Sequence, residues 1–274
     1  MKIIQMTNAT PTQTMGYVVQ AKTGQVLVID GGAKDNDKEL KRIIKSVGSH
    51  VDLWLITHPH SDHHDAIMQV LRNPEGITYD RLGASRLSDE WAESTGLPAD
   101  AKELIEWNAF AKNLDSRYFD IKNGEVFNLG SMKVEILAVA NPEILENPFN
   151  NQSVVIRVTE DGFVMLFLGD LGIEAGEKLL KTGIDLHSDG CQLAHHGQQG
   201  VNEKFYQAVK PTYAFWATPD WLWDNTPYLG GTPGTGPFKT QETAGWMKKL
   251  NTVNVFSFKH STVFDTKTKQ FGDY

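Results

Sequence analysis

The sequence predicts an α/β protein in which two mixed β-sheets face each other and helices cover both outer sides, giving four layers. Three observations support this fold class. The chain has 274 residues, 40% of them hydrophobic, so it can bury a large core as one domain spanning residues 1–274. Strand-like and helix-like segments alternate along it. Each half also repeats a coarse order of strands, a buried strand, polar residues and a helix, as two helix-covered sheets require.

The first predicted elements are a hairpin and a helix. Residues 16–21 and 25–30 are rich in β-forming side chains, and residues 22–24 separate them as a turn would. Gly31-Gly32 marks a tight turn. From 38 to 47 the apolar residues recur at helical spacing, so we expect a helix there.

A short apolar strand is expected at 51–57. It leads directly into the polar segment His58-Pro59-His60-Ser61-Asp62-His63-His64-Asp65. The next helix is predicted from Ala66 to Leu71. Asp65 precedes it and belongs to the residue types that cap helix N-termini, so we expect Asp65 to be structural.

Residues 75–120 differ in character from the segments around them. The stretch 89–114 looks helical and is rich in large apolar side chains, namely Trp91, Leu104, Ile105, Trp107 and Phe110. We predict a helical insertion at about 75–120 within the single domain.

The second half returns to strands. Residues 163–168 are almost wholly apolar, as expected for a strand buried on both faces, and they end in Gly169-Asp170. A strand at 190–194 ends in His195-His196-Gly197. Residues 219–237 form a long loop rich in Gly, Pro and Trp, and such loops are often functional. The other predicted strands are 132–138, 153–159, 213–217, 253–258 and 262–265, and the other predicted helices are 175–181 and 241–250.

Most of the nine histidines fall in two groups, each directly after an apolar strand. His58 and His60 are two apart on an extended segment, so they point the same way and can reach one metal ion. A turn at Ser61 lets Asp62 and His63 reach a second position nearby. Imidazole and carboxylate ligands together suit zinc, manganese or iron. The alternative is a solvated loop that is rich in histidine by chance.

This His-x-His-x-Asp-His spacing resembles the signature of the metallo-β-lactamase superfamily. Residues 28–32 resemble the turn beneath that family's metal site. Phe167-Leu168-Gly169-Asp170 resembles its Gly-Asp element, whose aspartate bridges two metals. The resemblance covers residues 15–215 and implies the metallo-β-lactamase fold with two divalent transition-metal ions, zinc or manganese, iron also being compatible.

Three shorter motifs indicate a closer branch. Asn150-Asn151-Gln152-Ser153, Gly169-Asp170 and His195-His196-Gly197 are similar to motifs of two hydrolases. One is the cytosolic hydrolase domain of competence DNA-uptake proteins, and the other is the phosphorylcholine esterase domain of a pneumococcal choline-binding protein. Both handle phosphodiesters, so the resemblance implies phosphoester or phosphodiester hydrolysis. We expect Asn150, Asn151 and Ser153 to bind substrate.

The sequence departs from the superfamily in two places. Asn150 and Asn151 stand where many members have a metal-binding histidine, and no histidine occurs between His196 and His260. One metal position can therefore lack a ligand and bind its ion weakly.

The expected metal ligands are His58, His60, Asp62, His63, Asp170 and His195. Neighbours on a strand point to opposite faces, so one of His195 and His196 binds metal while the other donates a proton, contacts substrate or packs. We prefer His195 as the ligand and His196 as a catalytic residue. Asp62 is expected to orient the attacking water or to bind metal. Buried Asp170 needs a partner, which metal supplies, although it can instead cap a helix. Asp30 either orients a ligand histidine or caps the next helix.

An aromatic cluster lies in and around the 219–237 loop and consists of Trp216, Trp221, Trp223 and Tyr228. It forms either a packed lid or a wall of the substrate pocket. Trp221 and Trp223 are our candidate substrate contacts, through stacking or cation–π attraction. We expect this loop and the 89–114 segment to wall the same pocket.

Charge and cysteine content restrict the partners. The formal net charge of −8 disfavours broad nucleic-acid binding, although a local basic patch stays compatible with it, so we expect a small-molecule or phosphodiester substrate. The lone Cys191 excludes an intrachain disulfide and fits a reducing compartment. No signal-peptide-like or membrane-spanning apolar run is evident. We therefore expect a cytoplasmic protein without a membrane partner, and the oligomeric state stays open.

Together these patterns predict a metal-dependent hydrolase, acting on a phosphodiester or phosphoester through a metal-activated water. A lactone, thioester or amide hydrolase on the same metal site is one alternative, because substrate choice lies in the pocket and loops. A non-catalytic metal-binding protein is the other.

Overall fold

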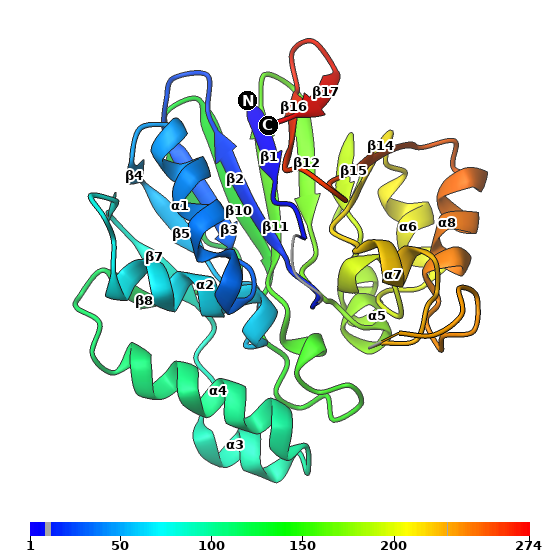
Figure 1. Cartoon of the computed structure of the whole chain (residues 1–274), viewed down its shortest axis with the longest axis horizontal. Coiled ribbons are helices and arrows are strands. Elements are labelled where there is room, and N and C mark those ends of the chain that lie inside the picture. The colour runs from blue at the N-terminus through cyan, green and yellow to red at the C-terminus, as the bar shows by residue number, and fades with distance from the viewer. Residues whose placement is uncertain (9–11, 229) are drawn as a thin grey trace.

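The computed structural model describes residues 1–8, 12–228 and 230–274. Their strands form two large mixed sheets that face each other, with helices on the outer sides (Figure 1). Within the described residues, one sheet has eight strands in the order β17-β16-β1-β2-β3-β5-β7-β8. The other has seven, in the order β15-β14-β13-β12-β11-β10-β9. This is the four-layer arrangement that the sequence predicts.

The eight-stranded sheet is antiparallel from β17 to β3 and parallel from β3 to β8. Its strands are β1 Lys2–Gln5, β2 Gly16–Gln20, β3 Val26–Asp30, β5 Leu53–Leu55, β7 Leu82–Ala84, β8 Tyr118–Asp120, β16 Thr262–Asp265 and β17 Gln270–Asp273. A separate parallel pair joins β4 His50–Val51 to β6 Thr78–Tyr79.

The seven-stranded sheet is antiparallel from β9 to β12 and parallel from β12 to β15. Its strands are β9 Val126–Leu129, β10 Met132–Ala138, β11 Val155–Glu160, β12 Phe163–Phe167, β13 Gly190–Gln192, β14 Tyr213–Trp216 and β15 Val253–Phe256.

The helices divide between the two outer faces. Figure 1 shows α1 and α2 against the first sheet, and α5, α6 and α8 against the second. Their bounds are α1 Asp37–Ser46, α2 Ser61–Arg72, α3 Asp89–Ser94, α4 Pro98–Ala111, α5 Ile173–Lys181, α6 Glu203–Val209, α7 Asp220–Trp223 and α8 Thr240–Lys249. Three 3₁₀ turns are η1 Lys34–Asn36, η2 Asn150–Gln152 and η3 His195–Gly197. No helix in the described part of the chain is long and apolar enough to cross a membrane.

Strand β12 explains how the layers form. Phe163, Met165 and Phe167 lie in the core between the two sheets, while Leu166 lies in the core between the second sheet and its helices. Alternate side chains of a strand point to opposite faces, so a strand with apolar layers on both sides must be apolar throughout. The predicted burial of this strand on both faces is confirmed.

The parallel strands bring their carboxyl ends to one edge of each sheet. Strands β3 and β5 are parallel neighbours, and so are β12 and β13. Asp30 ends β3, and Thr57 and His58 follow β5 closely. Asp170 and His195 follow β12 and β13. The sheets pack so that both edges meet at one rim, which collects these polar residues.

Several predicted elements differ from the structure. Helix α2 begins at Ser61, not at Ala66, so Asp65 lies inside the helix and is not its N-cap. The Ser61 N–H instead donates to Glu103 Oε2 at 2.7 Å, a cap from α4 that the local sequence does not reveal. The 75–120 segment is only partly helical, because it also supplies β6, β7 and β8. Helix α6, strand β17 and the short α7 were not predicted.

Candidate metal centre

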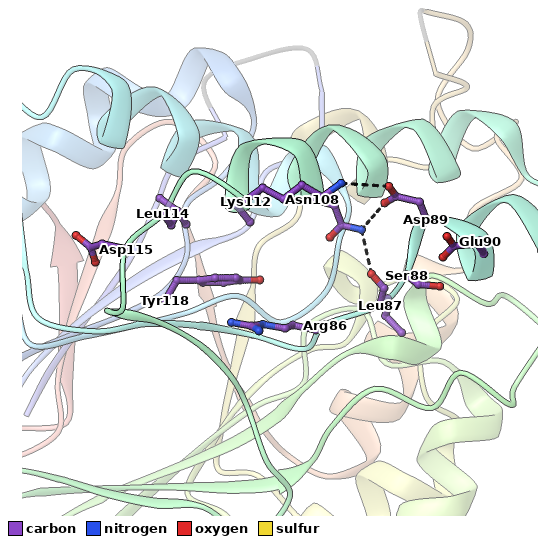
Figure 2. A pocket seen from close by; sticks show the side chains of 11 residues that line it. Arg86, Leu87, Ser88, Asp89, Glu90, Asn108, Lys112, Leu114, Asp115 and Tyr118 are labelled. Carbon is purple, nitrogen blue, oxygen red and sulfur yellow. Dashed lines mark hydrogen bonds and ion pairs between the residues drawn. The ribbon is translucent and has the colours of Figure 1, made fainter.

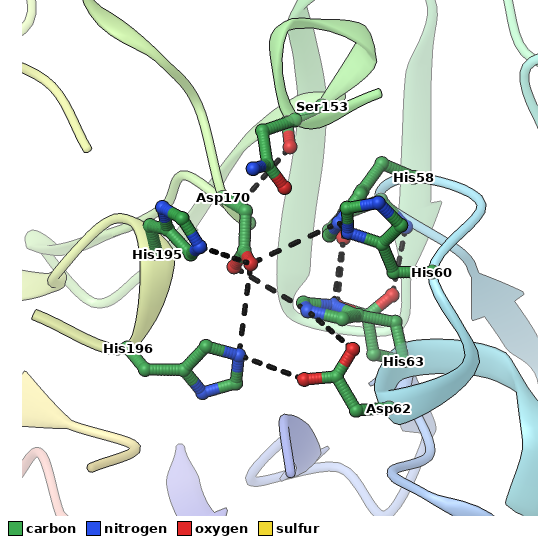
Figure 3. Close-up of polar contacts among 12 residues, drawn as sticks. His58, His60, Asp62, His63, Ser153, Asp170, His195 and His196 are labelled. Carbon is green, nitrogen blue, oxygen red and sulfur yellow. Dashed lines mark hydrogen bonds and ion pairs between the residues drawn. The ribbon is translucent and has the colours of Figure 1, made fainter. Parts of the chain in front are cut away.

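The candidate ligands converge at the rim from separate elements (Figure 3). His58 and His60 follow β5, and Asp62 and His63 occupy the first turn of α2. Asp170 follows β12, and the two neighbouring histidines of η3 follow β13. Figure 3 shows all of these side chains pointing toward one another.

Asp170 lies at the centre of the cluster, and its carboxylate is nearly buried. Its Oδ1 is 3.3 Å from His63 Nε2. Its Oδ2 is 3.8 Å from His58 Nε2, 3.6 Å from His196 Nε2 and 3.8 Å from His195 Nε2. One carboxylate therefore faces imidazole nitrogens from both sides of the rim and would be available to hold a cation there.

At this rim, two groups of three described residues have the spacing of a metal site. One group is His58, His60 and Asp170, and the other is Asp62, His63 and His196. Within each group, one ligand atom from every residue lies within 4.8 Å of the others.

Polar atoms without partners show that the cluster fits a cation. The buried side-chain atoms that make no hydrogen bond include His60 Nε2, His63 Nε2, His196 Nε2 and Asp170 Oδ1, and the last three lie 3.0–3.3 Å from a group of opposite charge. An unpaired buried polar atom costs about 1–3 kcal/mol, so several in one place require compensation. Divalent metal ions accept electron pairs from imidazole and carboxylate together, so this donor set fits them.

Hydrogen bonds outside the cluster orient His63. Its Nδ1 donates to Asp30 Oδ2 at 2.8 Å, because a carboxylate can only accept, and this fixes the ring with Nε2 facing Asp170. Asp30 also accepts from the Thr57 N–H at 2.7 Å and from Thr57 Oγ1 at 2.8 Å. Asp30 makes no side-chain cap to the following helix. Of the two roles considered for Asp30, the structure supports the orienting one.

The two neighbouring histidines have different surroundings. His196 Nδ1 donates to the Ala217 carbonyl at 2.8 Å, and its Nε2 lies 3.0 Å from Asp62 Oδ2. The His195 side chain is 16% exposed at the edge of the cluster, whereas that of His196 is fully buried. The choice of His195 as the ligand stays a prediction, and by spacing it is His196 that lies with Asp62 and His63.

The backbone explains why both rings reach the same rim. His195 and His196 have φ of 53° and 54°, and Gly197 follows with φ of 79°. This left-handed conformation is uncommon for residues with a side chain. It breaks the alternation of a strand, so the rule of opposite faces does not apply to this pair.

Burial and neighbouring charges act against each other on these groups. Burial alone would raise the pKa of Asp170 and of Asp62, but His63 and His196 hold both pKa values below the usual range. Burial lowers the pKa of His58 and of His195. The carboxylates are therefore ionised at neutral pH and these two imidazoles are neutral. Burial acts in the same direction on His63 and His196, but the neighbouring carboxylates outweigh it and raise both pKa values, so metal binding there would release protons.

Comparisons with known proteins agree with this geometry at the level of the fold. No family model matches the sequence, and no curated protein does. Among solved structures, the metallo-β-lactamase fold protein YhfI from Bacillus subtilis matches with a TM-score of 0.58 at 12% identity. The match covers 96% of this chain and 99% of that chain.

The chain has the metallo-β-lactamase fold.

A second solved structure shows how far this conclusion extends. The E377D mutant of CmlA β-hydroxylase matches with a TM-score of 0.56 at 13% identity, over 92% of this chain and 52% of that chain. A protein named as a hydroxylase thus has a similar arrangement. The metallo-β-lactamase fold therefore does not by itself determine the reaction, which depends on the site.

Within this metallo-β-lactamase fold, the Asn-Asn-x-Ser motif supports the backbone around Asp170. Ser153 Oγ accepts from the Asp170 N–H at 2.9 Å. A side chain on Gly169 would place Cβ 2.8 Å from Thr57 Cβ and 2.9 Å from Ser153 Oγ, and its φ is 54°, so only glycine fits there. Asn151 accepts from the Ala175 N–H at 3.1 Å, which caps α5.

This burial corrects two predicted substrate contacts. Asn151 and Ser153 have no exposed surface and bond to protein groups, so a direct contact with substrate is not supported for them. Asn150 is 6% exposed, and its Oδ1 has no partner. A role of Asn150 in substrate binding stays a prediction.

The two candidate tryptophans, Trp221 and Trp223, have different surroundings. Trp223 packs inward, with ring centroids 5.1 Å from Trp216 and 4.9 Å from Phe256, so the packing role applies to it. Trp221 instead lines a cavity that also contains His60 and Asp62 in its wall. Helix α4 and the loop after β14 both line this cavity, as we expected.

A larger cavity lies away from the centre. It has a volume of about 530 Å³ and lies between α4 and the segment that follows β7 (Figure 2). Asn108 bridges it, donating to the Leu87 carbonyl at 2.9 Å and to Asp89 Oδ1 at 2.7 Å. None of the candidate metal ligands lines it, so among the described cavities the smaller one beside His60 and Asp62 is the candidate for substrate.

Proposed function

We propose that this chain is a metal-dependent hydrolase whose substrate is a phosphoester or phosphodiester. The observation that carries the proposal is the position of Asp170, between two histidine–aspartate groups and beside a cavity. The substrate class is supported by the similarity of the Asn-Asn-x-Ser, Gly-Asp and His-His-Gly motifs to those of phosphodiester-cleaving hydrolases.

The residues that would hold the metal ions are the two groups described above. His58, His60 and Asp170 form one position, and Asp62, His63 and His196 form the other. The mixed nitrogen and oxygen donors suit zinc or manganese, with iron also compatible. When bound, such ions polarise the phosphoryl oxygen and lower the pKa of a water molecule toward neutrality.

Asp62 is placed to orient the attacking water. Its side chain is 20% exposed and lines the cavity, while Oδ2 faces His196 Nε2. Because His63 and His196 keep it ionised, the carboxylate accepts a hydrogen bond at neutral pH. Asp62 thereby holds the water on the cavity side of the centre.

His195 is placed to stabilise charge on the substrate. Its ring lies at the exposed edge of the cluster, with Nε2 3.8 Å from Asp170 Oδ2. Since burial lowers its pKa, the imidazole is neutral and acts as a hydrogen-bond donor to a phosphoryl oxygen, not as a cation that gives up its proton. We therefore assign His195 the catalytic role that the sequence analysis gave to His196.

The test compares substrate classes on one metal-loaded protein. We expect the protein to hydrolyse bis(p-nitrophenyl) phosphate. Its rate enhancement over the uncatalysed reaction should be well above the enhancement for p-nitrophenyl acetate. Treatment with a chelator should lower the activity at least about 100-fold, and added zinc or manganese should restore it. Circular dichroism before and after chelation is the control for folding.

Two results would contradict the proposal. Preferential cleavage of the carboxylic ester would indicate that the substrate is a carbonyl compound, such as a lactone, thioester or amide. A metal-loaded protein that is inert toward phosphodiesters, phosphomonoesters and carboxylic esters would support a non-catalytic metal-binding role.

A further inference from the structure

The residues that line the cavity beside the metal centre favour a positively charged ligand group. Its volume is about 360 Å³, and it shares His60 and Asp62 with the candidate metal centre. The other lining residues that matter are Asp100, Glu103, Gln198, Trp221, Tyr228 and Phe238.

The charged side chains of this cavity are all acidic. Asp100 and Glu103 project from α4 into its wall, and Asp100 Oδ1 lies 3.8 Å from His60 Nε2. No lysine or arginine is among the described residues that line it. A second phosphate of a substrate would therefore meet carboxylates without a compensating cation, whereas a positive group would be attracted.

Three aromatic rings also line this cavity. The Trp221 ring centroid is 5.3 Å from that of Tyr228 and 5.4 Å from that of Phe238, and both contacts are edge-on. Aromatic faces attract cations, and tryptophan does so most strongly. Carboxylates and aromatic rings that line one cavity thus make two independent contributions to binding a positive group.

Gln198 indicates which kind of cation fits. It is only 5% exposed and lines the cavity, yet its buried Oε1 has no hydrogen-bond partner. An acceptor in this position needs a donor, and a positive group that carries N–H bonds supplies both charge and donor. A quaternary ammonium offers no N–H.

We propose that this cavity binds an ammonium or guanidinium group of the substrate, next to the phosphoester that the centre cleaves. This inference rests on the proposed function for the position of the ester, but the cation preference itself is a property of the cavity. Long nucleic acids, with a phosphate at every residue, are then disfavoured as substrates.

A binding experiment tests the preference without turnover. Metal-loaded protein is titrated by calorimetry with O-phosphoethanolamine, ethyl phosphate and phosphocholine. We expect phosphoethanolamine to bind about ten-fold more tightly than ethyl phosphate, and more tightly than phosphocholine. Equal affinity for phosphoethanolamine and ethyl phosphate would overturn the proposal, and so would equal or tighter binding of phosphocholine.

Variants locate the preference in the cavity. Asp100→Asn and Trp221→Ala should each reduce this ten-fold ratio of affinities to about two-fold or less. Trp223→Ala is the matched control, because it removes a tryptophan that packs behind β14, and it should leave the ratio unchanged. An unchanged ratio in both cavity variants, with metal content and thermal unfolding normal, would contradict the assignment.

Hydrolysis rates of two matched esters distinguish a failure of this inference from a failure of the proposed function. The kcat/KM is measured for p-nitrophenyl esters of 2-aminoethyl phosphate and of ethyl phosphate. Hydrolysis of both without a preference would overturn the inference alone. Absence of hydrolysis together with selective binding of phosphoethanolamine would overturn the proposed function alone.

Discussion

Asp170→Asn is expected to lower the rate of hydrolysis by about 10³-fold or more, because charge stabilisation by the metals contributes several kcal/mol and each 1.36 kcal/mol corresponds to about ten-fold. The substitution keeps the shape of the side chain and the Ser153 contact to the Asp170 N–H. It removes the negative charge that faces imidazoles of both three-residue groups. Both metal positions should therefore be weakened together.

The measurement is kcat/KM together with the metal content of the purified variant. Asp65→Asn is the matched control, since it changes a carboxylate of α2 close to Asp62 and His63 that belongs to neither group. It should retain metal and activity. An Asp170→Asn protein that hydrolyses substrate normally would show that the site is misassigned, and circular dichroism would show whether a loss of activity reflects unfolding.

The second large effect is expected in the metal content and activity of variants at the adjacent residues His195 and His196. His196→Ala should lose metal from the second position and, with it, most of the activity, because His196 Nε2 faces Asp62 and Asp170 inside the cluster. His195→Ala should keep its metal content but lose about 10²–10³-fold in kcat, as removal of one hydrogen-bond donor to developing charge does.

Metal analysis of the two variants decides between the assignments. If His195→Ala loses metal and His196→Ala retains it, the sequence-based preference for His195 as ligand is restored and the geometry described here is misleading. Loss of metal in both variants would mean that both histidines bind. Normal kcat in His195→Ala would remove its proposed role in charge stabilisation.

The local part of the metal site could be predicted from sequence. His58, His60, Asp62 and His63 lie within six residues directly after a strand, so spacing alone brings them together. Asp170 could be added because it ends a strand whose apolar character shows that it is buried. These predictions depend on strand and turn geometry, which short segments of sequence largely determine.

The distinction between His195 and His196 could not be predicted. It depends on two successive left-handed residues, and the alternation rule assumes an extended chain. The roles of Asn151 and Ser153 were also missed, because their partners, Ala175 and Asp170, are contacts across the fold. Polar residues near a site were taken as substrate contacts, although they support the backbone.

The cavity was predicted only in outline. The sequence indicated which segments would wall it, but not Asp100 and Glu103, which reach the rim through the packing of α4. The position of Gln198 directly after the His-His-Gly motif could have indicated that this residue lies beside the site. Trp221 and Trp223 are only two residues apart, and which one faces the cavity depends on the short helix α7.

The most direct test of the metal centre is diffraction from crystals of the zinc-loaded protein at the zinc absorption edge. We expect two anomalous peaks about 3.5–4 Å apart on either side of Asp170. One should lie among His58, His60 and Asp170, and the other among Asp62, His63 and His196. No peak at this rim, or zinc bound only at the partly exposed group of His50, Asp52 and Asp80, would show that the metal centre is misassigned.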